Sequence, residues 1–324
     1  MSYFEVDAIS QSYLKALING GDATKQDDTK SLTLGNIIDT LVTKPIKEFS
    51  SHYMIIDKKP SDTMQKIVHT ALDYYNNEAG MTIMSALAAS IEDNNYIGNK
   101  SWDVSQKLDK VLKEAGDYFD ILLENQGKKF ISKADYEHAA LISTHISKCI
   151  TQLNPSNEHI IYQKEIYFNV VYKDMLNDET SYVYPAKAML DAIIIDYANK
   201  TILPIDVKYC SEKFEFSAKK YRYDIQASFY TRALQSEYPD YTIKPFTFVV
   251  GYDDSKTDIF QVTDFDLYVG EHGAKRIFAE TYTPHTTIKN EIDILGWMDG
   301  VKLHHEITHD IKSKELIKKL DIWN

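Results

Sequence analysis

Two aspartates and a lysine have the residue types and the spacing to do chemistry: Asp191, and then Asp206 and Lys208 two positions apart. Carboxylates are hard oxygen ligands of the kind that Mg²⁺ and Mn²⁺ prefer. A metal ion held by them would lower the pKa of a bound water and neutralise charge on a phosphate, and a second ion could stabilise the leaving oxygen. The Lys208 ammonium would point at the attacking water or the scissile phosphate, as a donor and not as a metal ligand. This set therefore suits phosphodiester hydrolysis.

A β-hairpin would bring these residues together. Two runs rich in β-branched residues, 189–195 and 201–209, flank a loop at 197–200 that contains the turn former Asn199. If residues 196 and 201 close the loop, the predicted pairs are Ile195–Ile202, Ile194–Leu203, Ala192–Ile205 and Leu190–Val207. Asp191 then lies opposite Asp206, roughly 5 Å away, where like charges destabilise a sheet. A cation between the two carboxylates would remove that cost.

The alternation of side chains along a strand predicts which residues share a face. One face of the hairpin would be apolar, with Leu190, Ala192, Ile194, Leu203, Ile205 and Val207. The other face would carry the two aspartates and the lysine. Residues 160–171 also alternate, which predicts a strand with Glu165 on its more polar face. We therefore expect Glu165, Asp191 and Asp206 to hold the metal, with the backbone carbonyl of Val207 as a further ligand.

A helix predicted over Ser217–Tyr238 would form a wall of this site. Four of its residues fall along one stripe, because steps of four, three and four positions align on a helix: Lys219, Tyr223, Gln226 and Tyr230. Gln226 and Tyr230 would contact DNA or orient the catalytic lysine, or else form a half-buried helix face. A basic cluster on the same segment consists of Lys219, Lys220 and Arg222. It could hold phosphates, and a solvated helix end explains it equally well.

These motifs resemble the PD-(D/E)xK nuclease superfamily, with Asp191 as the first aspartate and Asp206-x-Lys208 as the second half of the motif. Gln226-x3-Tyr230 is similar to the Q-x3-Y motif of the RecB-like branch. Within that branch, Ser10-x-Ser12-x-x-Lys15 followed by Gly35 resembles the exonuclease VIII (RecE) and phage-exonuclease group. The resemblance covers most of residues 9–42 and 160–235.

One position departs from the pattern. Where that group has a histidine four residues after the glycine, this chain has Asp39. Aspartate can bind a divalent cation or position water, and it can also be the polar side of the amphipathic helix predicted over residues 32–42. Ser12 is a second uncertain candidate for the site, because Ser10 and Ser12 suit helix capping.

The resemblance implies a restriction-endonuclease-like core and an exonuclease that uses Mg²⁺ or Mn²⁺, with two ions, on the ends of linear double-stranded DNA. It also implies a role in phage or bacterial recombination or repair, a ring-shaped homo-oligomer, a single-strand annealing protein as partner, and the cytoplasm of the bacterial host as location. Two alternatives stay open. One is a RecB-like single-strand or structure-specific endonuclease, and the other is an inactive, nuclease-derived DNA-binding recombination module.

The composition is that of an ordinary globular chain of 324 residues. A net charge of −12 argues against a protein that coats nucleic acid, but a nuclease needs only local basic residues. Cys149 and Cys210 lack metal-binding spacing and predict reduced thiols. The sequence shows no signal-peptide pattern and no apolar run near the ~20 residues of a membrane helix.

Periodicity predicts an α/β (α+β) fold with a mixed central sheet flanked by helices. We expect three regions: residues 1–155, mainly helical and part of the nuclease domain; residues 156–263, the catalytic sheet with the Q-x3-Y helix; and residues 264–324, helical. Predicted helices include Ser61–Asn76, Gly80–Ile91, Ser101–Gln126, Lys133–Leu153, Asp264–Ala279, Thr286–Trp297 and His304–Asn324. Predicted strands beyond the hairpin are Phe246–Tyr252 and Asp258–Val262.

Overall fold

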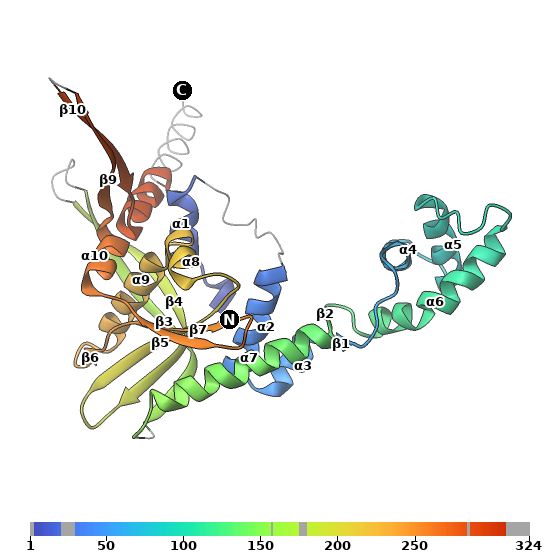
Figure 1. The fold of residues 1–324 in the computed structure, drawn as a ribbon, viewed down its shortest axis with the longest axis horizontal. Helices are drawn as coiled ribbons and strands as arrows, with labels where there is room; N and C mark the ends of the chain where they lie inside the picture. The colour runs from blue at the N-terminus through green and yellow to red at the C-terminus, as the bar shows by residue number, and fades with distance from the viewer. Residues whose placement is uncertain (1–2, 21–29, 157, 175–179, 284–285, 309–324) are drawn as a thin grey trace, which may run out of the picture. The chain divides into compact units, whose positions relative to one another are not determined.

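The protein is described from a computed structural model that covers residues 3–20, 30–156, 158–174, 180–283 and 286–308 (Figure 1). Its contacts divide the chain into two compact units, Met1–Lys44 with Ala139–Asn324, and Pro45–His138. The boundary falls within helix α7 (Lys133–Gln152). This division differs from the regions expected from composition, because the first 44 residues belong with the sheet and the next 94 do not.

The unit Pro45–His138 is mainly helical. Its elements are α3 (Ile46–His52), β1 (Tyr53–Ile56), α4 (Asp62–Asn77), α5 (Ile83–Asp93), α6 (Val104–Glu124) and β2 (Lys129–Ser132). Helices α4, α5 and α6 enclose a core that includes Ile67, Leu87 and Phe119. A capping box between Asp103 and Gln106 starts α6, because two backbone donors at the helix start find side-chain acceptors. The helices predicted in this part of the chain are confirmed.

The other unit is built on a mixed sheet. Its strands are β3 (His159–Asp174), β4 (Thr180–Asp196), β5 (Thr201–Cys210), β6 (Thr242–Ile243), β7 (Thr247–Tyr252) and β8 (Thr257–Gln261). They lie in the order β3-β4-β5-β7-β8, and β6 pairs with β5. Strand β4 is antiparallel to both β3 and β5, β5 and β7 are parallel, and β7 and β8 are antiparallel. The predicted α/β class with a mixed sheet is confirmed.

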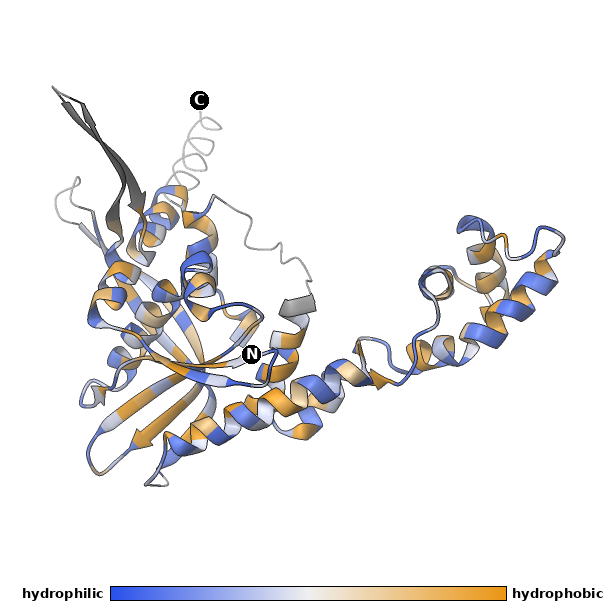
Figure 2. Ribbon diagram, in the orientation of Figure 1, coloured by the Kyte–Doolittle hydropathy of each residue, from blue (hydrophilic) through white to orange (hydrophobic). Residues whose placement is uncertain are grey.

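Helices cover this sheet. They are α1 (Gln11–Ile18), α2 (Lys30–Thr43), α8 (Phe214–Lys220), α9 (Tyr223–Glu237) and α10 (Asp264–His272), with a one-turn 3₁₀ helix η1 (Tyr3–Glu5). Helix α9 connects β5 to β6 and β7 and packs against β3 and β4, whereas α2 packs against β5 and β4. Figure 2 shows that the central strands carry mainly hydrophobic residues. The core between α9 and the sheet includes Phe168, Phe229 and Trp297.

The predicted hairpin register is largely correct. The β4–β5 ladder pairs Asp196 with Thr201, Ile195 with Ile202, Ile194 with Leu203, and Ala192 with Ile205. The ladder ends there, so the predicted pair Leu190–Val207 is wrong for these two described strands. From Ile205 onward β5 pairs with β7 instead. Strands β4 and β5 therefore part at the position of the two aspartates.

The predicted face assignment is wrong at the same position. Leu190, Ile193 and Ile195 belong to one core cluster, although strict alternation would group Leu190 with Ala192 and Ile194. The ladder between β3 and β4 pairs Tyr162 with Ala192 and Lys164 with Leu190 and skips Gln163 and Asp191 between them. Gln163 has a positive φ of 50°. A left-handed residue inside a strand rotates the side chains that follow it, so the alternation is interrupted beside Asp191.

The C-terminal part is not uniformly helical. The helix predicted over Thr286–Trp297 is wrong, because β10 (Thr286–Ile294) pairs with β9 (Ala274–Thr283) as an antiparallel hairpin. The predicted helix from Asp264 ends early at His272, because Gly273 follows with φ 74° and ψ −174°, an extended conformation of positive φ that glycine adopts without a steric penalty. A helix follows at residues 297–308, and the remainder of the predicted tail, 309–324, lies outside the described residues. None of the helices within the described ranges is long and apolar enough to span a membrane.

Candidate active site

The separation of β4 and β5 places a carboxylate between them. Beyond Ala192 the strands no longer pair, and Asp191 Oδ2 accepts a hydrogen bond from the backbone N–H of Val207 over 2.7 Å. The Asp191 carboxylate thus accepts the hydrogen bond that a backbone carbonyl of β4 would accept if the ladder continued. Asp191 is fixed to β5 within one residue of Asp206 and of Lys208.

Asp206 is the most buried charged residue of the group, with 1% of its surface exposed. Its Oδ1 accepts a hydrogen bond of 2.7 Å from Nε2 of the buried Gln226, and its Oδ2 forms an ion pair with the Lys208 ammonium. One helical turn after Gln226 on α9 lies the buried Tyr230, which is hydrogen-bonded to Gln226. The predicted Gln226-x3-Tyr230 pair therefore lies under the site, and its glutamine holds a carboxylate.

Lys208 keeps its charge in this position. Burial alone would lower the pKa of its ammonium, but Asp206 and Asp191 together outweigh burial and raise it. Its Nζ lies 5.0 Å from the ring centroid of Tyr223 and 5.9 Å from that of Phe248, which adds cation–π attraction. Lys208 is therefore a fixed positive charge at neutral pH, suited to donate hydrogen bonds and unsuited to take up a proton.

Asp39 on α2 joins the same group. Burial, and then repulsion from Asp206, raise the pKa of its carboxyl to about 6. Burial, and then repulsion from Asp206 and Asp39, raise the pKa of Asp191 well above its usual value. Burial also raises the pKa of Asp206, against the attraction of Lys208. Three carboxylates on α2, β4 and β5 thus repel one another in a poorly solvated place.

The carboxylates of Asp191 and Asp206 are oxygen donors of the kind that Mg²⁺ takes. Mg²⁺ takes one or two protein carboxylates and fills its other positions with water or substrate phosphate oxygens. Among the residues that the structure describes, no three His, Cys, Asp or Glu side chains lie close enough together to bind a metal by themselves. The electrostatic strain among Asp39, Asp191 and Asp206 is of the kind that a bound cation relieves.

Two predicted site residues are not brought into this group. Glu165 is exposed on β3, and its Oε2 accepts a hydrogen bond of 3.0 Å from the Tyr167 hydroxyl. Ser12 is also exposed, and its hydroxyl accepts a hydrogen bond from the Gln11 amide, whereas Ser10 caps α1 as expected. The carbonyl of Val207 stays a predicted ligand, since only its N–H has a described contact at the site.

The basic cluster is divided by the structure. Lys219 and Lys220 are exposed in the last turn of α8, where the helix dipole favours positively charged side chains. Arg222 precedes α9 in a left-handed conformation and forms a two-pronged ion pair with Asp224. Of the predicted substrate-binding residues on this segment, Tyr223 and Gln226 therefore contact the Asp206–Lys208 pair, while these basic residues lie beside it.

Lys15 lies beside the site, although the sequence predicted no role for it. Its Nζ donates a hydrogen bond of 2.7 Å to the carbonyl of Tyr221 and lies 5.9 Å from the Tyr223 ring centroid. Burial, and then repulsion from Lys208, lower the pKa of its ammonium to about 8, while Asp206 opposes that change. The position of Lys15 in the Ser10-x-Ser12-x-x-Lys15 motif was the signal that could have found it.

Comparison with known proteins adds little to this geometry. No protein-family model matches the chain, and no curated protein matches it. Among solved structures it is similar to a crystal structure of a "Putative exonuclease" from Eubacterium rectale, with 15% sequence identity over 68% of this chain and 76% of that chain. The TM-score of 0.30 is too low for the likeness to support a conclusion about function.

Proposed function

We propose that this protein is a metal-dependent deoxyribonuclease of the PD-(D/E)xK type that hydrolyses phosphodiester bonds, and that it acts as an exonuclease on linear double-stranded DNA. The observation that carries the proposal is the position of Asp191 and Asp206 beside the charged Lys208, at the point where β4 and β5 separate, with Asp39 in the same electrostatic environment. The resemblance of these motifs to recombination exonucleases supplies the substrate and the mode of action.

Asp39, Asp191 and Asp206 would hold Mg²⁺ or Mn²⁺, with Val207 contributing its carbonyl. When bound, the metal supplies an acidified water and neutralises charge on the phosphate. We place Asp39 in the set instead of Glu165, because Asp39 shares its electrostatic environment with both other aspartates and Glu165 is exposed. An aspartate then takes the position that a histidine has in the resembling group.

The other residues act by charge and position. Lys208 donates hydrogen bonds to the scissile phosphate or to the attacking water, and its raised pKa rules it out as the base. Gln226 holds Oδ1 of Asp206, which leaves the second oxygen of that carboxylate facing Lys208. Asp206 and Lys208 are on one strand, so their relative positions do not depend on loop motion.

A hydrolysis assay tests the proposal. Purified protein with Mg²⁺ should release nucleotides from end-labelled linear duplex DNA, and Asp206→Ala and Lys208→Ala should not. Covalently closed circular DNA should stay intact if the enzyme is an exonuclease, and its cleavage would favour the endonuclease alternative. A wild-type protein that is inert with both Mg²⁺ and Mn²⁺ would refute hydrolysis.

Calorimetric titration separates an enzyme from an inactive module. A protein that uses these carboxylates for chemistry should bind Mg²⁺ or Mn²⁺, and Asp206→Asn should weaken that binding. A recombination module without chemistry need not bind either ion. The single-strand annealing partner, the ring-shaped oligomer and the cytoplasmic location stay predictions from the resemblance.

A further inference from the structure

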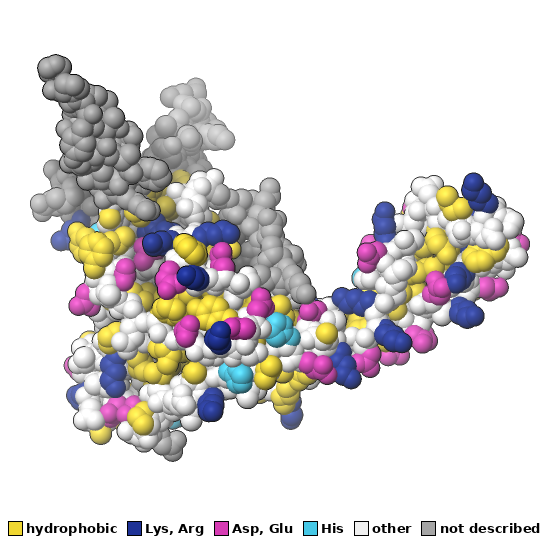
Figure 3. Space-filling model, viewed as in Figure 1, with side chains coloured by type: hydrophobic (Ala, Val, Ile, Leu, Met, Phe, Trp, Pro, Cys, Tyr) yellow, Lys and Arg dark blue, Asp and Glu magenta, His cyan; other side chains and the backbone are white. Residues whose placement is uncertain are grey.

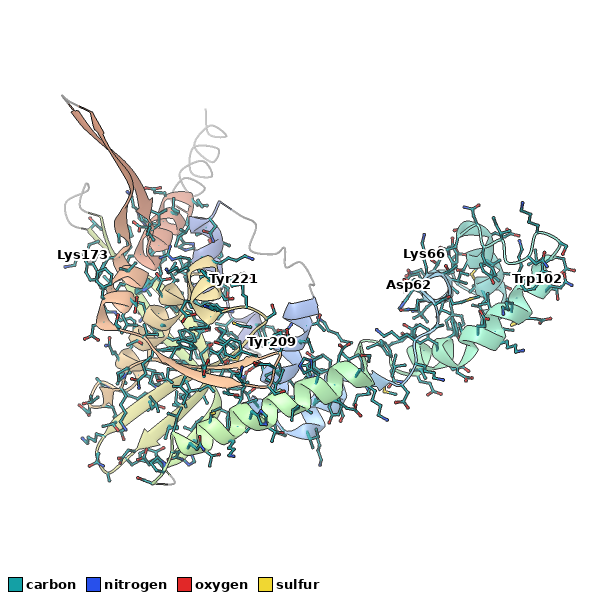
Figure 4. The ribbon with its side chains drawn as sticks, viewed as in Figure 1. Asp62, Lys66, Trp102, Lys173, Tyr209 and Tyr221 are labelled. Carbon is teal, nitrogen blue, oxygen red and sulfur yellow. The ribbon has the colours of Figure 1, made fainter. Side chains whose placement is uncertain are left out.

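A row of aromatic rings leads away from the candidate active site. Tyr221 and Tyr223 are stacked with ring centroids 6.0 Å apart and an interplanar angle of 27°. Tyr223 and Phe214 are stacked at 5.7 Å and 25°, and Phe214 and Phe260 follow at 4.5 Å and 31°. Four rings therefore contact one another in series, with the first three stacked and the fourth tilted. Tyr221, labelled in Figure 4, is at the outer end and is 49% exposed.

Lysine ammonium groups accompany this row. Lys220 Nζ lies 5.1 Å from the Tyr221 centroid, and both Lys208 and Lys15 lie over the Tyr223 ring. Lys208 belongs to the candidate active site, so the row passes the catalytic centre that we propose at its second ring, Tyr223. An exposed ring such as Tyr221, with ammonium groups nearby, suits a strand of nucleic acid, whose bases stack and whose phosphates are negative.

A cavity of about 480 Å³ adjoins the row. Tyr223, Phe214, Phe260 and Phe265 are among its walls, with Lys219 and Arg222 at its edge. Phe265 on α10 is 72% exposed, an unusual position for a large aromatic side chain. Figure 3 shows hydrophobic side chains gathered over the region of α8 and α10, with Lys and Arg side chains among them.

Acidic residues also line the cavity, and two of them have partners. Asp224 accepts the hydrogen bonds of Arg222, and the Asp266 carboxylate accepts a hydrogen bond from the hydroxyl of Thr263, the N-cap of α10. Glu215 is the third acidic residue of the wall. The cavity is therefore mainly apolar and close to neutral, which suits a nucleobase better than a phosphate.

We propose that the aromatic row and this cavity bind unpaired bases of a DNA strand, with the scissile phosphate at Lys208. The position of the phosphate rests on the proposed function, but the recognition of bases does not. A protein of net charge −12 gains little from general attraction to phosphates, so stacking is the available source of affinity. Bases within a duplex present no free π-face, and the strand that binds is therefore single or unpaired at its end.

Core packing explains part of the row but not all of it. Phe214 is buried and contributes to the hydrophobic core whatever the protein binds. Packing does not require Tyr221 and Phe265 to keep 49% and 72% of their surface exposed. The proposal therefore depends on these two exposed rings, which can be removed without opening the core.

Binding without metal provides the test, because no strand is cleaved. The full-length protein in EDTA is titrated into fluorescently labelled twelve-nucleotide strands, one of thymidylates and one abasic, and anisotropy is recorded. The thymidylate strand should bind more tightly. Phe265→Ala and Tyr221→Ala should each weaken its binding by roughly 5- to 150-fold and change abasic binding little. Tyr221→Trp should retain affinity, because it keeps the stacking surface.

Phe216→Ala is the matched control. Phe216 is on α8, is 63% exposed and is not among the residues that line the cavity, so its removal should leave both affinities unchanged. Equal affinity for the two strands, no measurable binding of either, or an equal effect of Phe216→Ala would overturn the proposal. A protein that discriminates bases in EDTA but hydrolyses nothing with metal would refute the proposed function alone.

Discussion

Replacing Asp39 by asparagine should stabilise the metal-free protein at neutral pH. The folded-state pKa of Asp39 is raised from 3.8 to about 6, first by burial and then by Asp206. A carboxyl with a raised pKa contributes stability below its unfolded pKa, and that stability is lost as the pH rises through the folded value. At 1.36 kcal/mol per pKa unit, the ionised carboxylate costs at most about 3 kcal/mol at pH 7.5.

Urea unfolding between pH 4 and pH 7.5, without divalent cations, measures this effect. Near pH 4 the wild type and Asp39→Asn should have similar free energies of unfolding. The variant should become progressively more stable than the wild type as the pH approaches and passes 6. Glu165→Gln is the control, because an exposed carboxylate should change stability by only about 0.5 kcal/mol or less at any pH.

Mg²⁺ should reverse the order. An ion that binds the folded state stabilises it in proportion to the logarithm of its concentration over Kd, and the wild type has the additional carboxylate ligand. Saturating Mg²⁺ should therefore stabilise the wild type more than Asp39→Asn. A difference between the two proteins that does not vary with pH, or an asparagine variant that is less stable at pH 7.5 without metal, would refute the electrostatic reasoning.

Three other changes have defined outcomes. Gln226→Leu leaves the buried Asp206 without its 2.7 Å donor and should lower the free energy of unfolding by about 1.5–3 kcal/mol, as well as slowing hydrolysis; unchanged urea unfolding would contradict the role given to this amide. Gly270→Ala should destabilise the protein by about 1–3 kcal/mol, because the added Cβ would overlap the Asp224 carbonyl. Gly116→Ala on α6 is the control: its Cβ meets no atom within 4 Å, and it should stabilise the protein by about 0.5–1 kcal/mol. Thermal unfolding of the two variants measures both effects. If the Lys15 ammonium assists substrate binding, wild-type kcat/KM should fall as the pH rises through about 8 and that limb should be missing in Lys15→Gln; a limb that persists in the variant would assign it to another group.

The sequence predicted local pairing better than it predicted which residues meet across the fold. The β4–β5 register followed from two β-branched runs around a short loop, which leaves few alternative pairings. The interruption at Asp191 did not follow, because it lies beside an irregularity at Gln163, in a strand that is adjacent only after folding. Alternation is a local rule, and the neighbouring strand overrides it here.

The helix predicted at Thr286–Trp297 failed for a local reason. Thr286, Ile288, Ile292 and Ile294 follow a two-residue period that favours a strand, and β10 is the result. Patterns of this length suit both structures, and pairing with β9 decides between them.

The candidate site shows the same distinction. Asp191, Asp206 and Lys208 could be grouped from sequence because one hairpin carries them. The sequence could not decide whether Glu165 or Asp39 lies at the site, because the position of each depends on how a distant element of the chain packs. Helix α2 packs against β5 and places Asp39 near the other aspartates, while Glu165 pairs with Met189 beyond the point where the strands part.

The rate of Mg²⁺-dependent hydrolysis of end-labelled linear duplex DNA by Asp39→Asn and by Glu165→Gln tests the assignment of the metal site most directly. If Asp39, Asp191 and Asp206 hold the metal, Asp39→Asn should lose about 100-fold or more of the wild-type rate, and Glu165→Gln should keep most of it. The reverse pattern, with Glu165→Gln inactive and Asp39→Asn near the wild-type rate, would contradict the site described for this protein.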